Sequence, residues 1–181
     1  EEGTWRRMHY RQKKAILFRF AELMERDAEQ LALLESLDVG KPIKDSLSVD
    51  VPGSIKTLRY YAEALDKVYG EVGPETTDRI SFAVHEPLGV IGIIVPWNFP
   101  LLMAMWKVGP ALAMGNSIVL KPAEQSPLTA LKMGELALEA GLPPGVLNIV
   151  PGFGATAGKA LALHMDVDMI AFTGSGPVGK L

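Results

Sequence analysis

The 181-residue sequence contains no cysteine. This absence excludes disulfides, thiolate metal sites and a cysteine nucleophile within these residues. The three histidines, His9, His85 and His164, are far apart in the sequence, and no carboxylate-rich motif joins them. Metal sites are typically built from clustered histidine, cysteine and carboxylate ligands. The sequence therefore predicts neither a disulfide framework nor a metal centre.

Strong charge of one sign and long apolar runs are also missing. The net charge is −3 and the isoelectric point is about 5.7. The nearest basic cluster, between Arg6 and Lys14, lies on a helical pattern typical of a solvated helix face, so nucleic acid is not an expected partner. No apolar run approaches the roughly 20 residues of a membrane span, and the first residues do not resemble a signal peptide. We therefore expect a soluble, cytoplasmic protein that does not contact membranes.

The first half of the sequence shows helical periodicity. Apolar residues recur at three- and four-residue steps after residue 15 and predict helix over 5–40. A second segment of this helix begins at Asp27, a good N-cap residue, and ends at Gly40, a good C-cap residue. A third helix is expected from Val51-Pro52, where proline is tolerated, to Gly70. The apolar positions of the first stripe are Ile16, Leu17, Phe20, Leu23 and Met24.

The second half shows strand patterns. Ile80, Phe82 and Val84 alternate with polar or small residues, which predicts a half-exposed strand. Continuous apolar runs follow, separated by helical stretches, and this alternation is typical of βαβ units with a parallel sheet covered on both faces. We therefore expect an α/β fold, a Rossmann-like doubly wound parallel sheet preceded by a helical segment. The four runs lie at 90–95, 117–121, 146–150 and 169–173.

The expected sheet is incomplete. Residues 1–88 form a helical layer with an edge strand, and residues 89–181 begin the doubly wound domain. After the last apolar run only "GSGPVGKL" remains, which is too short for the helix that it opens. A sheet face would then stay uncovered, so we expect these residues to be part of a longer protein.

Four loop segments follow the four buried runs. Ligands of open parallel sheets bind at the carboxyl ends of the strands, where these segments lie. The two glycine-rich ones miss the spacing of the dinucleotide fingerprint, and tight strand-to-helix turns need glycine in any case. A helix opening after "FTGS" would nevertheless direct free backbone N–H groups at an anion. The four segments are "PWNFP", "KPAE", "PGFGATAG" and "TGSGPVG".

Lys121 and Glu124 have two interpretations. They form either a solvated ion pair, which contributes little to stability, or a ribose-binding pair at the end of a strand. In the second case Glu124 accepts hydrogen bonds from the ribose hydroxyls. Its carboxylate would repel the 2′-phosphate of NADP, which predicts a preference for NAD.

Asn98 in "PWNFP" also has two interpretations. It either caps the helix that begins at Pro100, or it supplies a fixed N–H donor to a developing oxyanion. Phe99, Met103 and Trp106 follow at helical spacing. They belong either to the core or to the wall of an apolar tunnel.

The segments "PWNFP", "KPAEQSPLTA", "GLPPGVLNIVPGFG" and "IAFTGSGPVG", in this order and spacing, resemble the aldehyde dehydrogenase superfamily. The resemblance runs from about Trp5 to Leu181. It implies a helical N-terminal segment over 1–88 with an oligomerisation-type strand near 80–86, followed at 89–181 by the first part of an NAD-binding Rossmann-like domain. The catalytic domain of the family is absent from this chain.

The resemblance also implies roles for individual residues. Asn98 matches the catalytic asparagine of the oxyanion hole. The wall of the substrate tunnel is implied at Phe99, Met103 and Trp106. The implied cofactor contacts are the backbone at Ile94, Val95, Pro96 and Trp97, the ribose contacts Lys121 and Glu124, Gly154 over the adenine, Ser175 and Val178 at the pyrophosphate helix, and Phe172, Thr173 and Gly174 beside the nicotinamide.

The missing cysteine separates this sequence from the reaction of the family. There a cysteine thiolate attacks the aldehyde to form a thiohemiacetal, hydride passes to NAD+, and a glutamate activates water. Both residues come from sequence after the end of this chain. The resemblance thus implies the N-terminal part of an NAD-dependent aldehyde dehydrogenase and predicts that the 181 residues alone are inactive. The alternatives are a non-catalytic remnant that binds nucleotide or a partner subunit, and an acyl-phosphate or acyl-CoA reductase, which "PWNFP" with "KPAE" disfavours.

The resemblance is strongest to bacterial enzymes that act on γ-glutamyl-aminobutyraldehyde and related polyamine-derived aldehydes, or that have broad specificity with NAD. The expected tunnel suits a medium aliphatic, aromatic or amino aldehyde. Members of the family form dimers and tetramers, so we expect the full-length protein to be a homo-oligomer.

Overall fold

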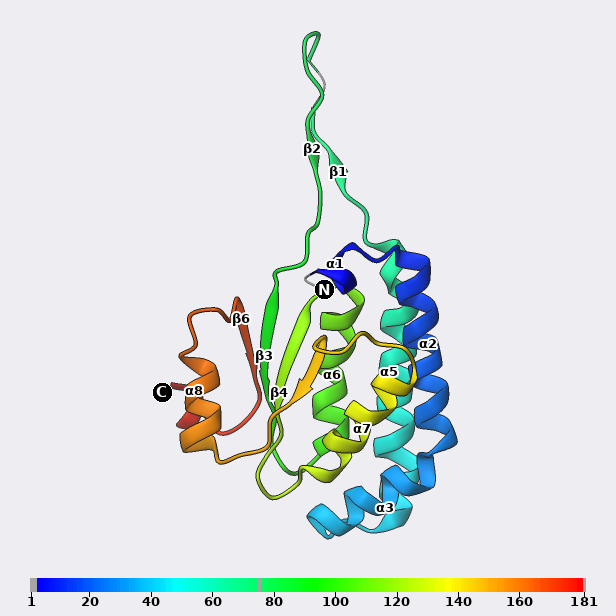
Figure 1. Cartoon of the computed structure of the whole chain (residues 1–181), viewed down its shortest axis with the longest axis vertical. Coiled ribbons are helices and arrows are strands. Elements are labelled where there is room, and N and C mark those ends of the chain that lie inside the picture. Colours follow the sequence, from blue (N-terminus) through cyan, green and yellow to red (C-terminus); the bar gives the residue numbers. More distant parts are fainter. Residues whose placement is uncertain (1–2, 75, 181) are drawn as a thin grey trace.

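The computed structural model describes residues 3–74 and 76–180 (Figure 1). Residues 1–2, 75 and 181 lie outside the described part, and with them the outer ends of the expected ranges 1–88 and 89–181. The strands are β1 (Glu71–Val72), β2 (Phe82–Ala83), β3 (Val90–Ile94), β4 (Ser117–Lys121), β5 (Leu147–Ile149) and β6 (Met169–Phe172). The helices and helical turns are α1 (Thr4–Arg7), α2 (Tyr10–Arg26), α3 (Ala28–Val39), α4 (Ile43–Asp45), η1 (Ser46–Asp50), α5 (Val51–Ala64), η2 (Leu65–Lys67), α6 (Pro100–Ala113), α7 (Leu128–Glu139), η3 (Gly154–Gly158), α8 (Lys159–Ala162) and η4 (Val178–Lys180).

The four expected buried strands form one parallel sheet with the order β5-β4-β3-β6. The chain passes from β3 through α6 to β4 and through α7 to β5, and then returns to place β6 on the other side of β3. The direction of winding therefore reverses between β3 and β6. In open α/β sheets the crevice outside such a switch point is where ligands bind. The predicted doubly wound sheet is confirmed.

Helices cover the two faces of this sheet unequally. On one face α6 and α7 lie against the strands, and α2 and α5 form a second layer outside them (Figure 1). Because α6 is packed on both sides, it is apolar nearly all round. On the other face Leu161 of the short α8 approaches β3 at Gly92, where an added Cβ would lie 3.2 Å from Leu161 and 2.5 Å from Ile170. Glycine in β3 thus allows α8 to pack closely.

The break between α2 and α3 lies at Asp27, and Gly40 ends α3 in the left-handed conformation with φ 69°. Both positions agree with the sequence prediction. The side chain of Asp27 does not cap α3, however. It forms ion pairs with Arg26 and Lys132, at 2.6 and 3.2 Å, and Arg26 also pairs with Glu139 of α7. Asp27 therefore ties the α2–α3 junction to α7 instead of closing the helix.

The third helix, α5, begins at Val51 with Pro52 in its first turn, as the sequence predicted, but further helical structure precedes it. Helical structure starts at Ile43 directly after Pro42, and α4 and η1 lead without a break into α5. The turn η1 has the wider i→i+5 bonding pattern, which accommodates the missing N–H of Pro52. Pro52 therefore lies at the start of α5, and the irregular turn η1 extends the helical stretch before it.

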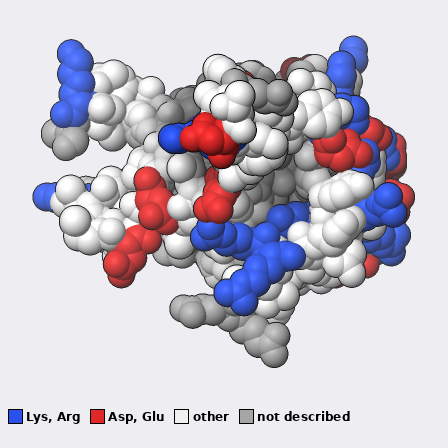
Figure 2. All heavy atoms as spheres, turned by 90° about the horizontal axis from the view of Figure 1, so that it is seen from above, with Lys and Arg blue, Asp and Glu red and all other residues white. Residues whose placement is uncertain are grey.

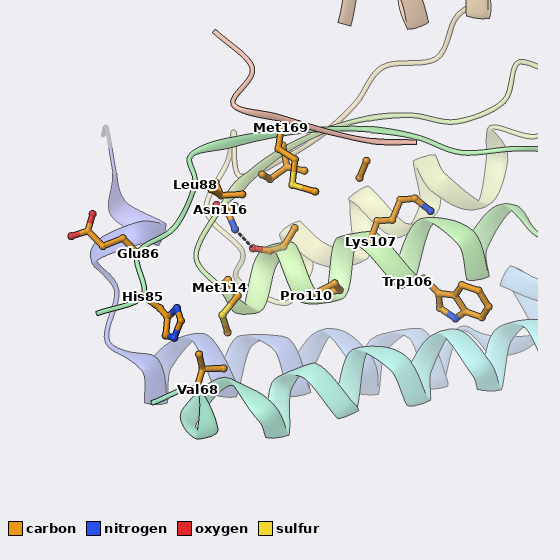
Figure 3. Close-up of a pocket in the computed structure, with 13 residues that line it drawn as sticks. Val68, His85, Glu86, Leu88, Trp106, Lys107, Pro110, Met114, Asn116 and Met169 are labelled. Atoms are coloured by element: carbon orange, nitrogen blue, oxygen red, sulfur yellow. Dashed lines mark hydrogen bonds between the residues drawn. The ribbon is translucent and has the colours of Figure 1, made fainter. Parts of the chain in front are cut away.

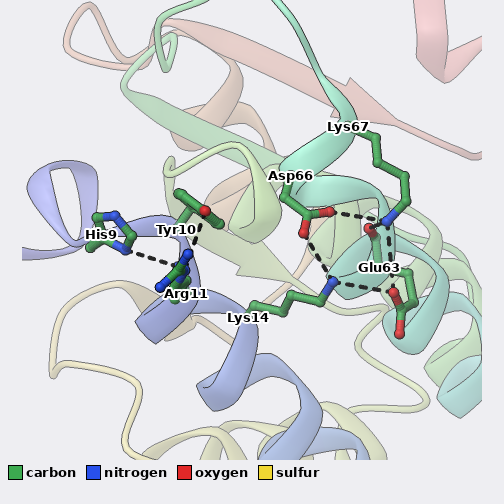
Figure 4. Close-up of polar contacts among 7 residues, drawn as sticks. All are labelled: His9, Tyr10, Arg11, Lys14, Glu63, Asp66 and Lys67. Atoms are coloured by element: carbon green, nitrogen blue, oxygen red, sulfur yellow. Dashed lines mark hydrogen bonds and ion pairs between the residues drawn. The ribbon is translucent and has the colours of Figure 1, made fainter.

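The basic cluster at the N-terminus is only partly a solvated face. Lys14 pairs with Glu63 at 3.2 Å and Asp66 at 3.3 Å and so connects α2 to the end of α5 (Figure 4). Such exposed pairs contribute little to stability. Lys13 is buried instead, and its Nζ donates to the carbonyl of Arg6 at 3.2 Å. Burial lowers the pKa of Lys13 below its ordinary value.

The expected half-exposed strand differs most from the prediction. Only Phe82–Ala83 pair with β1, in an antiparallel ribbon that projects from the body (Figure 1). Ile80, Phe82 and Val84 are exposed by 61%, 70% and 74%. The alternating pattern was expected to bury one face, but this ribbon contacts no layer of the described chain that would cover either face.

The surface carries charges of both signs. Basic and acidic side chains are interspersed on the face shown in Figure 2. Among the described residues, no helix is long and apolar enough to cross a membrane.

Candidate functional site

Backbone hydrogen bonds connect the carboxyl ends of the four parallel strands. Val150 N–H donates to Leu120 at 2.9 Å, Val95 N–H to Lys121 at 3.3 Å, and Thr173 N–H to Ile94 at 3.0 Å. The four loop segments identified in the sequence therefore begin side by side at one edge of the sheet. The switch point between β3 and β6 lies at this edge, so Val95 and Thr173 flank the expected ligand crevice.

Lys121 ends β4 and is not solvated. Lys121 is only 3% exposed, and its Nζ donates to the Oε2 atom of Glu124 at 3.0 Å. The turn η3 lies against the lysine stem, because a Cβ added at Gly158 would be 3.9 Å from its Cδ. The solvated ion pair considered from the sequence is thus wrong for Lys121. Gly154, expected in a loop, is the first residue of η3, which continues into α8.

Glu124 is exposed at the same edge. Its own backbone N–H, followed by the Lys121 ammonium, lowers the pKa of the Glu124 carboxyl. An exposed carboxylate is therefore oriented by a buried lysine. The pair thus offers the carboxylate oxygens of Glu124 as hydrogen-bond acceptors to a ligand at the sheet edge, while Lys121 stays buried.

The segment after β6 folds back over the Phe172 ring. An added Cβ would overlap this ring at Gly174 and would lie 3.2 Å from it at Gly179. The carbonyl of Ser175 accepts from Gly179 N–H at 3.0 Å, which starts one helical turn as the sequence predicted. Val178 in this turn is 53% exposed. Thr173, Gly174 and Ser175 therefore lie together beyond the end of β6, next to the end of β3.

Asn98 does not cap α6. Phe99 is the N-cap residue and makes no side-chain cap, and Asn98 is exposed without a side-chain hydrogen bond to any described residue. The capping interpretation of Asn98 is therefore wrong. Its amide is free to donate to a ligand, as the oxyanion interpretation requires.

Met103 and Trp106 lie one turn apart on α6, and Phe99 is the N-cap residue of this helix. Met103 packs partly against the core, whereas Phe99 and Trp106 are 36% and 53% exposed. Trp106 lines a groove of about 450 Å³ between α5 and α6, together with Lys56, Thr57, Tyr60 and Tyr61. Phe99 and Met103 do not line this groove.

A second groove, of about 470 Å³, lies between α6 and the sheet. Figure 3 shows Lys107 on the sheet side of α6 and Trp106 on the α5 side. The lining is mostly apolar and was not predicted from the sequence. It consists of Val68, His85, Glu86, Leu88, Ile91, Trp106, Lys107, Pro110, Ala111, Met114, Asn116, Met169 and Ala171.

Sequence reasoning missed Lys107. Its Nζ donates to Thr173 Oγ1 at 2.6 Å and so links α6 to the end of β6. Burial lowers the pKa of this lysine. One signal was present, because Lys107 is the only charged residue between Glu86 and Lys121. A single charge in a strongly apolar stretch indicates a specific partner.

The sequence also did not predict a buried polar cluster beneath "PWNFP". Glu35 and Asp50 are 0% and 1% exposed. Lys41 pairs with Asp50 at 2.6 Å and lies 3.9 Å from the centre of the Phe99 ring. Glu35 Oε2 accepts from Leu101 N–H at 3.4 Å.

Burial raises the pKa of Glu35 to about 7, and the charge of Asp50 adds to this. Lys41, the Leu101 N–H and Thr129 act in the opposite direction. The ordinary pKa of this carboxyl is 4.5. Between pH 4.5 and 7, Glu35 is therefore protonated in the folded protein and ionised in the unfolded chain. The stability linked to this proton is complete below pH 4.5 and is lost as the pH rises through 7.

We therefore expect Glu35→Gln to flatten the pH dependence of stability. From pH 5 to pH 8 the wild-type free energy of unfolding should fall by about 2 kcal/mol relative to the variant. Urea unfolding of both proteins at these two pH values measures the difference. Parallel pH profiles for the two proteins would show that Glu35 titrates at its ordinary value.

Comparison with known proteins agrees with this geometry. The model of the aldehyde dehydrogenase family matches residues 1–181. The NADP/NAD-dependent aldehyde dehydrogenase PuuC of Escherichia coli is 57% identical over 180 residues, which are 99% of this chain and 36% of that protein. Two solved structures are also similar to this chain. An indole-3-acetaldehyde dehydrogenase with NAD+ has a TM-score of 0.97 and 57% identity over 98% of this chain and 36% of its own. A γ-glutamyl-γ-aminobutyraldehyde dehydrogenase from Burkholderia cenocepacia has a TM-score of 0.96 and 56% identity over the same shares.

The chain spans about a third of the length of the curated relatives that it matches, 34–36% for the first three. The similarity therefore covers these residues almost completely but only part of each relative. The matched part includes the parallel sheet and all four loop segments at its carboxyl edge.

Proposed function

The chain belongs to the aldehyde dehydrogenase family, and we propose that it supplies the NAD-binding edge and the oxyanion donor of an enzyme that oxidises an aldehyde to a carboxylic acid. The observation that carries this proposal is the hydrogen bonding that places Lys121, Val95 and Thr173 together at the switch point, with the free amide of Asn98 three residues after Val95.

The residues at the edge suit a dinucleotide. Glu124 is oriented by Lys121 to accept from ribose hydroxyls, and the turn η3 at Gly154 lies beside this pair. Ser175 begins a helical turn whose free N–H groups suit a pyrophosphate. Backbone at Ile94 to Trp97 forms the adjoining wall. NAD+, when bound, accepts the hydride that leaves the aldehyde carbon.

Asn98 would bind the substrate oxygen. An amide N–H directed at that oxygen stabilises the negative charge that develops on it during addition to the carbonyl. Phe99 and Trp106 would form an apolar wall beside it, with Met103 supporting them. The nucleophilic thiol of the family reaction has to come from residues outside this sequence, because the sequence contains no cysteine.

Preference for NAD over NADP is part of the proposal. The carboxylate of Glu124 would repel a 2′-phosphate, yet the name of the Escherichia coli relative includes both cofactors. The neighbouring ammonium of Lys121 reduces this repulsion, so we expect a preference and not an absolute exclusion.

We expect Glu124→Gln in the full-length protein to raise kcat/KM for NADP+ relative to NAD+ by about tenfold, the equivalent of one lost charge repulsion of about 1.4 kcal/mol. Steady-state kinetics with both cofactors measure this ratio. Glu139→Gln, on an exposed part of α7, is a control of equal charge change. An unchanged ratio in Glu124→Gln would show that this carboxylate does not select the cofactor.

The substrate class is a further part of the proposal. The aromatic wall favours a medium aliphatic, aromatic or amino aldehyde, including γ-glutamyl-aminobutyraldehyde and related polyamine-derived aldehydes. Solved relatives at nearly equal identity are named for an indole acetaldehyde and for the γ-glutamyl compound. Identity alone therefore does not choose between them, and an aldehyde panel is required.

The domain division and the assembly also stay proposals. We propose that residues 1–88 are the N-terminal helical segment, with its exposed β1–β2 ribbon pairing in a homo-oligomer, and that 89–181 begin the NAD-binding domain. The exposed apolar side chains of the ribbon support a partner there. We also propose a cytoplasmic location for the full-length protein.

NADH formation tests the function. Protein made of these 181 residues should give no rate with NAD+ and mixed aldehydes, and the full-length protein should turn over. The missing thiol favours a second candidate, a nucleotide-binding chain without turnover. NAD+ binding without NADH formation by the full-length protein would support that candidate and would exclude the dehydrogenase.

A further inference from the structure

The N-terminus of α6 begins two residues after Asn98 and has no side-chain cap from its N-cap residue. Phe99 occupies the N-cap position and makes no side-chain cap, and Pro100 has no N–H. The first free amide of the helix is therefore that of Leu101. An uncapped amide at a helix start is commonly satisfied by a serine, threonine, asparagine or aspartate at the N-cap, and the nearest such residue here is Asn98.

A carboxylate from another helix takes this role. Oε2 of Glu35, on α3, accepts from Leu101 N–H at 3.4 Å, although the two residues are separated by 66 positions in the sequence. The Glu35 side chain is fully buried, and its second oxygen, Oε1, has no partner among the described residues. A buried carboxylate is costly unless it is paired or hydrogen-bonded, and a helix N-terminus favours negative charge.

The same helix caps α7 in the same way. Asp38 Oδ2 accepts from Leu128 N–H at 2.8 Å, and the residue before α7, Pro127, supplies no side-chain cap. Both crossover helices of the sheet therefore begin against carboxylates of α3. The two begin at the carboxyl edge, where the proposed site lies.

A second contact holds the residue next to Asn98. Lys41 Nζ lies 3.9 Å from the centre of the Phe99 ring, and Asp50 fixes the ammonium through a 2.6 Å ion pair. Glu35 thus contacts the backbone of Leu101, and Lys41 contacts the side chain of Phe99. Both contacts lie just after Asn98 in the sequence. Together they hold the turn while leaving the Asn98 side chain without an intramolecular partner.

We propose that Glu35 is a positioning residue that caps α6 in place of Asn98, so that the Asn98 amide stays free and aimed for the substrate oxygen. The inference rests on the proposed function only for the last step, the use of Asn98 in catalysis. Without Glu35 the unsatisfied N–H of Leu101 would compete for the Asn98 carbonyl oxygen, because that side chain is the nearest local capping group.

The test compares three substitutions of Glu35 in the full-length protein at pH 8. Glu35→Gln keeps the length and an acceptor oxygen, Glu35→Asp keeps the charge but withdraws it from Leu101, and Glu35→Leu removes both. Asp38→Ala is the matched control, because it removes the equivalent bond from the same helix to α7. Hydrogen exchange followed by mass spectrometry reports on residues 98–103 and 127–132, and steady-state kinetics report kcat and KM.

We expect Glu35→Asp and Glu35→Leu to speed exchange at 98–103 about tenfold, as the loss of one cap of about 1.4 kcal/mol implies, and to lower kcat about tenfold with KM for NAD+ unchanged. Glu35→Gln should keep both the exchange rate at 98–103 and kcat near their wild-type values. Asp38→Ala should speed exchange at 127–132 only. If Glu35→Leu does not fold, the comparison of Glu35→Asp with Glu35→Gln decides the result.

Different results overturn different parts. Wild-type exchange at 98–103 in Glu35→Asp would exclude the capping, and faster exchange with unchanged kcat would exclude the positioning role. If instead the wild-type protein oxidises no aldehyde, or Asn98→Ala keeps full activity, the proposed function fails. The exchange data would still report on the cap in that case, so the two failures are distinguishable.

Discussion

Replacing Asn98 with alanine is expected to lower kcat of the full-length protein about 10²- to 10³-fold, because a single oxyanion donor contributes about 3–4 kcal/mol to the transition state. The Asn98 amide is exposed at the switch point and makes no competing bond to a described side chain. It is placed by the backbone between β3 and α6, both of which are packed in the core. The donor is thus preorganised, which is the condition for a large catalytic effect.

Kinetics of three proteins check this prediction. Asn98→Ala should leave KM for NAD+ within about twofold, because the proposed ribose contacts, Lys121 and Glu124, lie at the end of another strand. Asn98→Asp keeps the size but loses the N–H donor and adds negative charge beside the developing oxyanion, so its kcat should fall at least as far. Retention of more than a tenth of wild-type kcat in Asn98→Ala would assign the oxyanion to another donor.

Replacing Gly89 with alanine is expected to cost about 3–4 kcal/mol of folding free energy. Gly89 precedes β3 with φ 132°, a conformation that side chains rarely adopt, and an added Cβ would overlap the Asp168 carboxylate. That carboxylate accepts from Val90 N–H at 2.7 Å and joins the start of β3 to the chain before β6. The substitution thus combines backbone strain with the loss of a bond between the start of β3 and the chain before the edge strand β6.

A second glycine separates these two contributions. Gly40 also has positive φ, 69°, but an added Cβ there would meet no atom within 4 Å, so Gly40→Ala should cost only about 1 kcal/mol. Urea unfolding of both variants measures the difference. Adding Asp168→Ala to Gly89→Ala should recover part of the lost stability, since the two sites interact. Equal losses at Gly89 and Gly40 would show that the clash with Asp168 is absent.

Much of the fold was predictable because its signals are local. Strand β4 occupies the predicted 117–121, and α3 ends at the predicted Gly40. Apolar runs, alternation and glycine caps depend on neighbours within a few residues, which a sequence displays directly. The same locality placed the start of α5 at Val51 and Pro52, because proline is tolerated in the first turn of a helix.

The ribbon at β2 shows where local patterns mislead. Alternation of Ile80, Phe82 and Val84 predicted one buried face, but burial requires a covering layer, and no described residue provides one. A pattern reports what a strand is suited to contact and not what it contacts. In the proposed homo-oligomer, another subunit would cover these side chains.

The candidate site was likewise predictable only in part from the sequence. The order of the four loop segments was visible in the sequence, and parallel βαβ units place their strand ends at one edge. The sequence therefore determined the element types, the four parallel strands and the segments that lie at the site. It could not show that the Asn98 side chain does not cap α6.

Tertiary structure alone decided the roles of Glu35 and Lys107. Glu35 caps Leu101 and Lys107 binds Thr173, each across 66 positions of sequence. It also decided that Lys121 is buried while Glu124 is exposed. A buried charge is tolerated only where a partner compensates its lost hydration, and partners so distant in sequence are brought together only by the packing of helices on the sheet.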